Sequence, residues 1–234
     1  MNVYFVLALC FVPYVLLFVI SKFFCKVKVS TCLIASVLGL LSVVPIIFLQ
    51  FVFAEVVQVE KKLEMGAFFV LFLSCLIYNG LLEEGIKMVC LFGIPSKKLE
   101  LKEFFMASLL FGMILGCFES SIYFLQHLQN VNSRGGELLY SILFVRMFSS
   151  DLIHTFCAGL SGLFVWGIKN KKFSLMPLVY AIVIHGVFNF FRHFDGGIKY
   201  FSYVAILFAI IECRVKYVNF SSKKQNCDLV EDDN

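Results

Sequence analysis

Charged residues are scarce in this sequence. Asp, Glu, Lys and Arg together make up 15% of its 234 residues, whereas hydrophobic residues make up 60%. A soluble globular domain has about a quarter of its residues charged, so this chain lacks the polar surface that would cover a globule. The shortage excludes a water-soluble enzyme and a disordered protein. The fold class that remains is all-α, a polytopic transmembrane helix bundle embedded in a lipid bilayer.

Three further absences narrow the function. The formal net charge is only +4, and the basic residues are scattered, which excludes a nucleic-acid partner. The nine cysteines are an odd number and include no CxxC pair, which excludes a disulfide framework and a zinc knuckle. The HExxH signature of many zinc proteases is also missing from the sequence.

Long hydrophobic runs are what the sequence has in abundance. A spanning helix needs about 20 mostly apolar residues, and we predict about seven such spans. The third and fifth runs are about 30 residues long, so each is expected to be tilted, kinked or preceded by an interfacial helix. We predict one transmembrane domain over residues 1–220 and a polar, disordered tail over 221–234. The predicted spans are Met1–Ile20, Thr31–Ala54, Gly66–Ile94, Phe104–His127, Leu138–Ile168, Ser174–Phe194 and Ile198–Cys213.

The distribution of Lys and Arg predicts the orientation of these spans. Thirteen of the 20 basic residues follow the first, third, fifth and seventh spans, and five lie in the alternate links. Positive residues are concentrated on the cytoplasmic side of membrane proteins. We therefore predict an N-terminus outside, a cytoplasmic C-terminus and a multi-pass protein of a cell membrane.

Several spans contain residues that are costly in lipid. A charged side chain at the centre of a bilayer costs about 2.5–3.5 kcal/mol on insertion scales, so these groups are expected to face one another or water inside the bundle. They come from the third, fourth, fifth and sixth spans. They are Glu83, Glu84, Lys87, Glu119, Asp151, His154 and His185.

Four of these residues are expected at a similar depth. Counting back to the nearest Lys at about 1.5 Å per residue places Glu83, Glu119, His154 and His185 roughly 20–25 Å from one face of the membrane. Four helices thus present a carboxylate or an imidazole at nearly the same height. The agreement predicts one shared site, with a catalytic core built from the third to the sixth span.

Spacing within the helices adds detail to this site. Glu83 and Lys87 are four residues apart, which predicts an ion pair, and Glu84 is turned by about 100°. A buried glutamate of this kind can act as a general base. His185 and Asn189 share one helix face and can donate hydrogen bonds to a developing oxyanion.

The same residues resemble motifs of a known family. In this order and on four hydrophobic spans, they look like the PrsW family of intramembrane proteases, related to the CAAX prenyl endopeptidase superfamily. The resemblance covers about residues 66–190, and it departs from the usual pattern at Leu115, where an aromatic residue is common. The motifs are Glu83-Glu84-xx-Lys87, Glu119-xxx-Tyr123, Arg146 with His154, Gly159 and Gly162, and His185-xxx-Asn189.

The resemblance implies cleavage of a membrane-anchored protein, such as an anti-sigma-factor-like regulator, in a bacterial cytoplasmic membrane. Glu83 or Glu84 would activate water with help from His154, and His185 with Asn189 would stabilise the oxyanion. Lys87 and Tyr123 would support the site, and Glu119 would be catalytic. We expect no cofactor, with Zn²⁺ held by Glu83, Glu119, His154 and His185 as the alternative.

Two other interpretations stay open at this point. Gly159-Leu-Ser161-Gly162 resembles the GxSG string of rhomboid serine proteases, with His185 as the base. The depth count places Ser161 roughly 8 Å away from His185 in height, which argues against that pair. A buried Glu/His cluster also occurs in proton-coupled transporters, and an inactive homologue would keep the same residues for binding alone.

Overall fold

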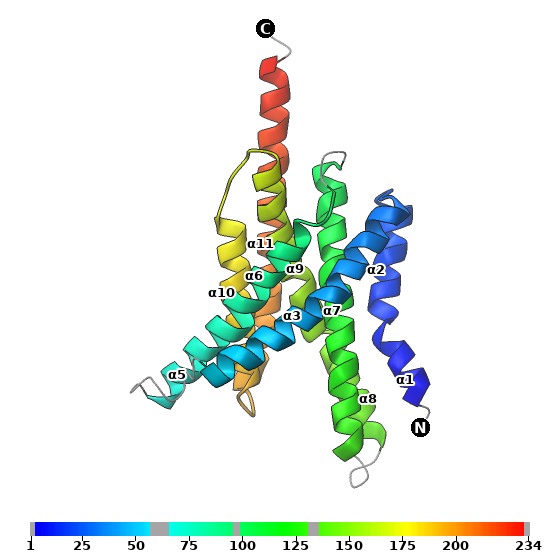
Figure 1. Cartoon of the computed structure of the whole chain (residues 1–234), viewed down its shortest axis with the longest axis vertical. Coiled ribbons are helices and arrows are strands. Elements are labelled where there is room, and N and C mark those ends of the chain that lie inside the picture. Colours follow the sequence, from blue (N-terminus) through cyan, green and yellow to red (C-terminus); the bar gives the residue numbers. More distant parts are fainter. Residues whose placement is uncertain (1–2, 57–65, 96–98, 131–135, 232–234) are drawn as a thin grey trace.

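The computed structural model describes residues 3–56, 66–95, 99–130 and 136–231, and every regular element within these ranges is a helix. The predicted all-α class is therefore confirmed (Figure 1). The first half of the chain forms α1 (Val3–Cys10), α2 (Val12–Phe23), α3 (Val29–Val56), α5 (Ala67–Ser74), the π-helix η1 (Cys75–Leu82) and α6 (Glu83–Leu91). The second half forms α7 (Leu101–Asn130), α8 (Gly136–Met147), α9 (Ser150–Lys169), α10 (Met176–Arg192), the 3₁₀ turn η3 (Ile198–Tyr200) and α11 (Phe201–Glu231).

Five helical stretches of the described residues are long and apolar enough to cross a membrane. They are Val3–Phe23, Val29–Phe53, Ala67–Leu91, Leu101–Leu128 and Tyr140–Lys169, and α10 is a shorter apolar helix. The seventh predicted span corresponds to η3 and the first part of α11. Three charged residues, Glu212, Arg214 and Lys216, interrupt the apolar character of α11 there. The expected seven spans thus become five full-length helices, the shorter α10 and the apolar start of α11.

Both of the unusually long runs are interrupted, as predicted. The third run passes from α5 through eight π-helical residues into α6. A π-helix spaces its hydrogen bonds one residue wider than an α-helix, and such stretches are frequent at functional sites. The fifth run is broken between Met147, which ends α8, and Ser150, which begins α9.

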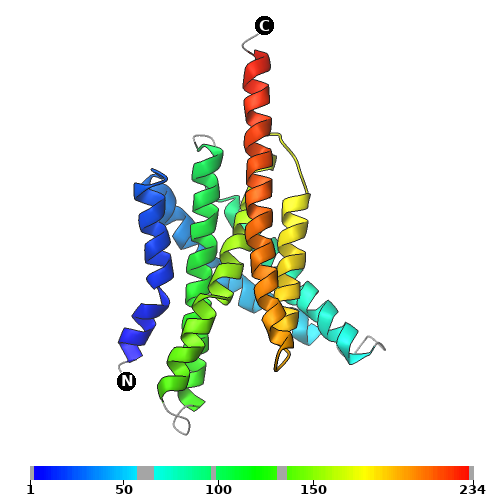
Figure 2. The ribbon, with the colours of Figure 1, turned by 180° about the vertical axis from the view of Figure 1, so that it is seen from behind.

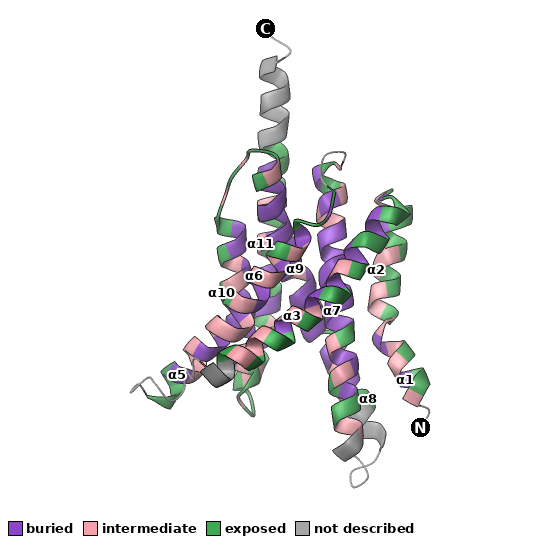
Figure 3. Cartoon of the chain, viewed as in Figure 1, coloured by how far each residue is buried: buried purple, intermediate pink, exposed green. Residues whose placement is uncertain are grey.

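The centre of the bundle is the contact between α7 and α9, and burial is concentrated along these two helices (Figure 3). Two glycines of α7 allow the contact. A Cβ on Gly112 would lie 2.3 Å from the carbonyl oxygen of His154, and one on Gly116 would lie 2.8 Å from the Cα of Asp151. Only residues without a side chain permit this approach. The close contact places the polar residues of α9 beside Glu119 of α7.

The outer surface of the bundle is apolar. Phe48, Phe51 and Leu41 on α3 and Leu207 on α11 are all more than half exposed. In water such a surface would be unstable, but against lipid tails it requires no cover. The pattern agrees with a bundle that faces lipid all round.

The two termini lie at opposite ends of the bundle (Figures 1 and 2). The links α2–α3, α6–α7 and α9–α10 lie at the end that carries the C-terminus. These links follow the first, third and fifth predicted spans. They therefore lie on one side of the bundle, as the predicted orientation requires. That this end is cytoplasmic stays a prediction. Of the residues counted for it, Lys61, Lys62, Lys97, Lys98 and Arg134 lie outside the described residues.

The segment after Ser221 differs from the expected disordered tail. The backbone of α11 stays helical as far as Glu231, and residues 232–234 lie outside the described residues. A helix that is already nucleated adds further residues at little cost, so a polar extension can continue it. That the tail is dispensable stays a prediction.

Candidate active site

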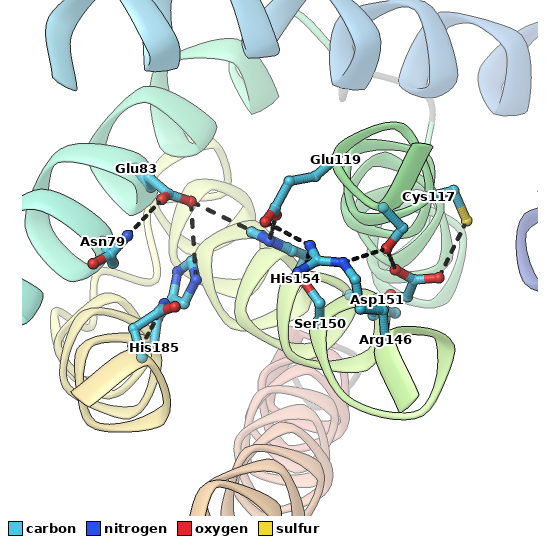
Figure 4. Close-up of polar contacts among 12 residues, drawn as sticks. Asn79, Glu83, Cys117, Glu119, Arg146, Ser150, Asp151, His154 and His185 are labelled. Carbon is cyan, nitrogen blue, oxygen red and sulfur yellow. Dashed lines mark hydrogen bonds and ion pairs between the residues drawn. The ribbon is translucent and has the colours of Figure 1, made fainter. Parts of the chain in front are cut away.

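Glu83 is the first residue of α6, directly after the π-helix, and its two carboxylate oxygens have different surroundings (Figure 4). Oε1 accepts hydrogen bonds from Nε2 of Gln50 at 2.8 Å and from Nδ2 of Asn79 at 3.3 Å. Oε2 lies 4.0 Å from Nδ1 of His154 and 3.9 Å from Nε2 of His185. The amides on α3 and η1 therefore hold one oxygen and leave the other facing two imidazoles.

The two imidazoles meet edge to face. The ring centroids of His154 on α9 and His185 on α10 are 4.9 Å apart, with an interplanar angle of 84°. Each ring also contacts a second glutamate: Nδ1 of His185 lies 2.7 Å from Oε1 of Glu84, and Nε2 of His154 contacts Oε2 of Glu119. Each histidine is therefore oriented by a glutamate on one nitrogen and turns its other nitrogen towards Glu83.

Glu84 and Lys87 are fully buried behind this arrangement. Nζ of Lys87 lies 2.6 Å from Oε1 of Glu84 and 3.0 Å from Nδ1 of His154. The hydroxyl of Ser161 donates to Oε2 of Glu84 at 3.0 Å. The predicted ion pair between Glu83 and Lys87 is wrong, because Lys87 pairs with Glu84. Glu84 and Lys87, three residues apart, lie on the face of α6 that packs against α9, whereas Glu83 is turned by about 100° towards Gln50 and Asn79.

Arg146 holds Glu119 from the other side. Its Nη2 lies 2.7 Å from Oε1 of Glu119, and its guanidinium lies over the ring of Tyr123 at 4.3 Å from the ring centroid. Its Nε donates to the hydroxyl of Ser120 at 3.3 Å, and that hydroxyl donates to Oδ1 of Asp151 at 2.6 Å. Ser120 thus joins Arg146 to Asp151. Ser120 lies between them because Arg146 turns towards α7.

A cavity of about 320 Å³ opens in front of these groups. Of the eight predicted site residues, Glu84 and Lys87 are not among those that line it, because both are completely buried. The predicted residues that line it are Glu83, Glu119, Tyr123, His154, His185 and Asn189. The groups expected at one depth on four helices therefore share one chamber.

Asn189 lies one turn after His185 on the same face of α10, as predicted. Its Nδ2 donates to the carbonyl oxygen of His185 at 3.2 Å. A carboxamide nitrogen carries two hydrogens, so the second remains for a group in the cavity. The polar interior of this helix thus presents an imidazole and an amide side by side.

Ser161 lies closer to the site than the depth count indicated, because it shares Glu84 with His185. Its hydroxyl is completely buried, donates to a carboxylate and is not among the groups that line the cavity. A serine nucleophile must donate its hydrogen to the base that activates it. Within the described part of the chain, no hydrogen bond joins Ser161 to His185, so the rhomboid-like pair gains no support.

The donor set at the centre fits a metal ion. One ligand atom each from Glu83, His154 and His185 lies within 4.8 Å of the others. Two of the separations, 3.9 and 4.0 Å, are within twice the bond length of about 2.0–2.1 Å that zinc makes to nitrogen and oxygen. Glu119, also predicted as a ligand, is outside this group because its oxygens contact His154 and Arg146.

Three side chains that hydrogen-bond to these residues were not predicted as part of the site. Gln50 and Asn79 hold Glu83, and Ser120 connects Arg146 to Asp151. A signal for two of them was present. Gln50 is an isolated amide in an apolar run, and Asn79 precedes Glu83 by four residues, which is one helical turn.

Taken together, the chain is a polytopic helical membrane protein with a buried Glu/His cluster around a polar cavity. It belongs to the PrsW family, whose model, described as PrsW family intramembrane metalloprotease, matches residues 28–212. The match is wider than the 66–190 over which the motifs carried the resemblance. Neither a curated protein nor a solved structure matches the chain. The placement in the CAAX prenyl endopeptidase superfamily stays a proposal.

Proposed function

We propose that the protein is an intramembrane endopeptidase that hydrolyses a peptide bond of a membrane-anchored protein, for example an anti-sigma-factor-like regulator. Membership of the PrsW family supports the class of reaction. The observation that carries the site is the free oxygen of Glu83, which faces His154 and His185 beside a polar cavity. A water molecule held at that point would lie within reach of a base and of two imidazoles.

Glu83, rather than Glu84, is the residue that we propose to act on this water. Glu83 lines the cavity, and one of its oxygens has no hydrogen bond to another described residue. Both oxygens of Glu84 are occupied, by Lys87 and His185 on one side and Ser161 on the other. Glu84 is therefore a positioning residue that orients His185.

Glu83, His154 and His185 are the residues that would hold a metal ion, in line with the family's description. Bound there, a divalent ion would act as a Lewis acid and lower the pKa of a coordinated water. The glutamates on the outer nitrogens match the usual second shell of metal-ligating histidines. One contact opposes this, because the ammonium of Lys87 is 3.0 Å from Nδ1 of His154. A ligand role for that nitrogen requires Lys87 to withdraw.

Proton positions follow from the partners of each imidazole. Lys87 can only donate, so Nδ1 of His154 accepts and its Nε2 carries the hydrogen that Glu119 accepts. Glu84 accepts from Lys87, so Nδ1 of His185 carries a hydrogen and its Nε2 offers a lone pair. A neutral His185 is thus suited to ligate a metal. The predicted oxyanion role requires His185 to be protonated, whereas Asn189 can donate in either state.

The Glu119–Arg146 pair completes the proposed mechanism. Arg146 holds Oε1 of Glu119 while Oε2 accepts from His154. A carboxylate in this position orients the imidazole of His154, so that its Nδ1 stays turned towards Glu83, which would take a proton from the water and pass it to the leaving amine. Glu119 lines the same cavity as Glu83, in which the leaving amine would form.

The test compares cleavage in cells that express the wild-type chain or Glu83→Gln. Membrane proteins are analysed for new peptide termini by mass spectrometry, and Glu100→Gln, an exposed glutamate outside the site, is the matched control. We expect new termini in or beside single-span segments with the wild type and the control but not with Glu83→Gln. Identical termini with all three chains, at equal amounts of inserted protein, would contradict the proposed function.

A further inference from the structure

A second cavity of about 240 Å³ adjoins the one described above. Its wall is built from the last part of α7, from α8, from the end of α10 and from η3 with the start of α11. Tyr123, Arg146 and Arg192 line both cavities. A chain that occupies the first cavity could therefore continue directly into the second.

The second cavity is rich in positive charge. Arg146, Arg192 and Lys199 all line it. Arg146 is neutralised by Glu119, but among the described residues no carboxylate lies within ion-pair distance of Arg192 or Lys199. Two cations at the wall of a cavity, each without a counter-charge there, attract an anionic group.

Tyrosines provide further hydrogen-bond donors in this cavity. Tyr200 and Tyr203 stack with ring centroids 6.3 Å apart, and Nζ of Lys199 lies 5.6 Å from the ring centroid of Tyr200. Within the described part of the chain, the hydroxyls of these two tyrosines and of Tyr123 make no hydrogen bond. A carboxylate accepts such hydroxyl hydrogens together with those of Arg and Lys.

The position of the cavity indicates where its ligand would come from. The link between α10 and α11 lies at the end of the bundle opposite the C-terminus (Figures 1 and 2). Lys, Arg and Tyr at the end of a span mark the boundary between lipid and water. The orientation predicted above makes this the outer boundary of the membrane.

We infer that this cavity, lined by Arg192, Lys199, Tyr200 and Tyr203, binds an acidic side chain of the substrate polypeptide just outside the membrane. The inference rests on the proposed function, since it names a feature of the substrate. The walls shared with the catalytic cavity favour a polypeptide over a lipid headgroup, because a polypeptide held at Glu83 has to leave along a neighbouring surface. An Asp or Glu on that flank would therefore select the substrate and set its register.

Binding of synthetic peptides tests the inference without depending on cleavage. A dye-labelled single-span peptide of Leu and Ala carries Asp-Asp on the flank that exits beside the α10–α11 link, and a matched peptide carries Asn-Asn. Affinities are measured for the full-length protein in nanodiscs of phosphatidylcholine. We expect the wild type to bind the Asp-Asp peptide about tenfold more tightly.

Two variants and one control define the outcome. In the double variant Arg192→Gln with Lys199→Gln, the preference for Asp-Asp is expected to fall to about one. A third peptide carries Lys-Lys at the same two positions. In the double variant Arg192→Glu with Lys199→Glu, the preference is expected to reverse, so that the Lys-Lys peptide binds more tightly than the Asp-Asp peptide. The control, Lys22→Gln with Lys102→Gln, removes two exposed lysines outside the cavity and keeps the preference.

The contrary results are equally defined. Equal binding of both peptides by the wild type, or an unchanged preference in the Gln double variant, overturns the inference. In a second set of nanodiscs that also contain phosphatidylglycerol, loss of this bound lipid in the Gln double variant, without any change in peptide preference, assigns the cavity to a lipid and also overturns the inference. Cleavage is tested separately by Glu83→Gln, so a failure of the peptidase proposal is recognised independently.

Discussion

Glu83 and Glu84 are adjacent in the sequence and yet belong to two different environments. Glu83 faces a polar cavity, is held through one oxygen by two neutral amides, and turns the other oxygen to two imidazoles. Glu84 is completely buried, and both of its oxygens are hydrogen-bonded. The polar network thus has an open side, where Glu83 lines the cavity, and a closed side, where Glu84, Lys87 and Ser161 are completely buried.

The difference teaches what each side requires. A group that activates water needs an oxygen that is not already satisfied, and the open side provides one. A group that orients its neighbours needs all of its contacts made, because an unsatisfied buried charge is costly. Removing Glu83 should therefore affect chemistry, and removing Glu84 should affect the fold.

The largest effect is expected for Glu83→Gln. The amide keeps the size of the side chain but cannot act as a base, so peptide cleavage should fall by about a thousandfold. Thermal unfolding in detergent should change little, because Gln50 and Asn79 can still bond its oxygen. Wild-type turnover in this variant would contradict the proposed role of Glu83 as the base.

The converse is expected for Glu84→Gln. This change leaves the buried ammonium of Lys87 without its counter-charge and should lower the free energy of unfolding by about 3 kcal/mol. The double variant Glu84→Gln with Lys87→Met removes both charges and should recover much of that loss. The measurement is unfolding in mixed micelles. Full stability of the single variant would contradict the assignment of Glu84 to the closed side.

Glu119→Gln sharpens the comparison at the boundary between the two sides. Loss of this outer partner of His154 should weaken metal binding about 10–100-fold without removing any of the three proposed ligands. Elemental analysis of the purified protein and titration with a chelator measure the change. If the wild type is free of metal and fully active after chelation, the metal-dependent version is wrong and the glutamate-only version stands.

The smallest effect is expected for Ser161→Ala. The change removes one hydrogen bond to Glu84 and should cost about 1 kcal/mol of stability. Cleavage should continue, because Ser161 lies on the closed side. Complete loss of cleavage in a protein that still folds would instead favour a serine nucleophile.

Much of the site could be predicted because polar groups in lipid have few alternatives. Glu83, Glu119, His154 and His185 were expected at one depth, and all four line the same cavity. A residue count along a helix is also a distance along its axis, so groups at equal counts on neighbouring helices can meet in one cavity. The Gly112 and Gly116 contacts, which bring α7 against α9, follow from the same regular geometry.

The partners within the site could not be predicted in the same way. Spacing alone allowed Lys87 to reach Glu83 or Glu84, and the choice depends on how α6 is rotated against α9. Ser120 was equally hidden, because its partners Arg146 and Asp151 come from other helices. Ser161 and His185 both contact Glu84, although the count for straight helices placed Ser161 roughly 8 Å from His185 in height.

The π-helix Cys75–Leu82 has a consequence for the two glutamates that follow it. Each turn of a π-helix contains more residues than a turn of an α-helix. The stretch therefore sets the rotation of α6 about its own axis, and with it the direction in which each side chain of α6 points. Deleting a single residue there would restore ordinary winding and rotate Glu83 by about 100°. Glu84 would then face the cavity in place of Glu83. The eight-residue π-helix therefore determines which of the two adjacent glutamates lines the cavity.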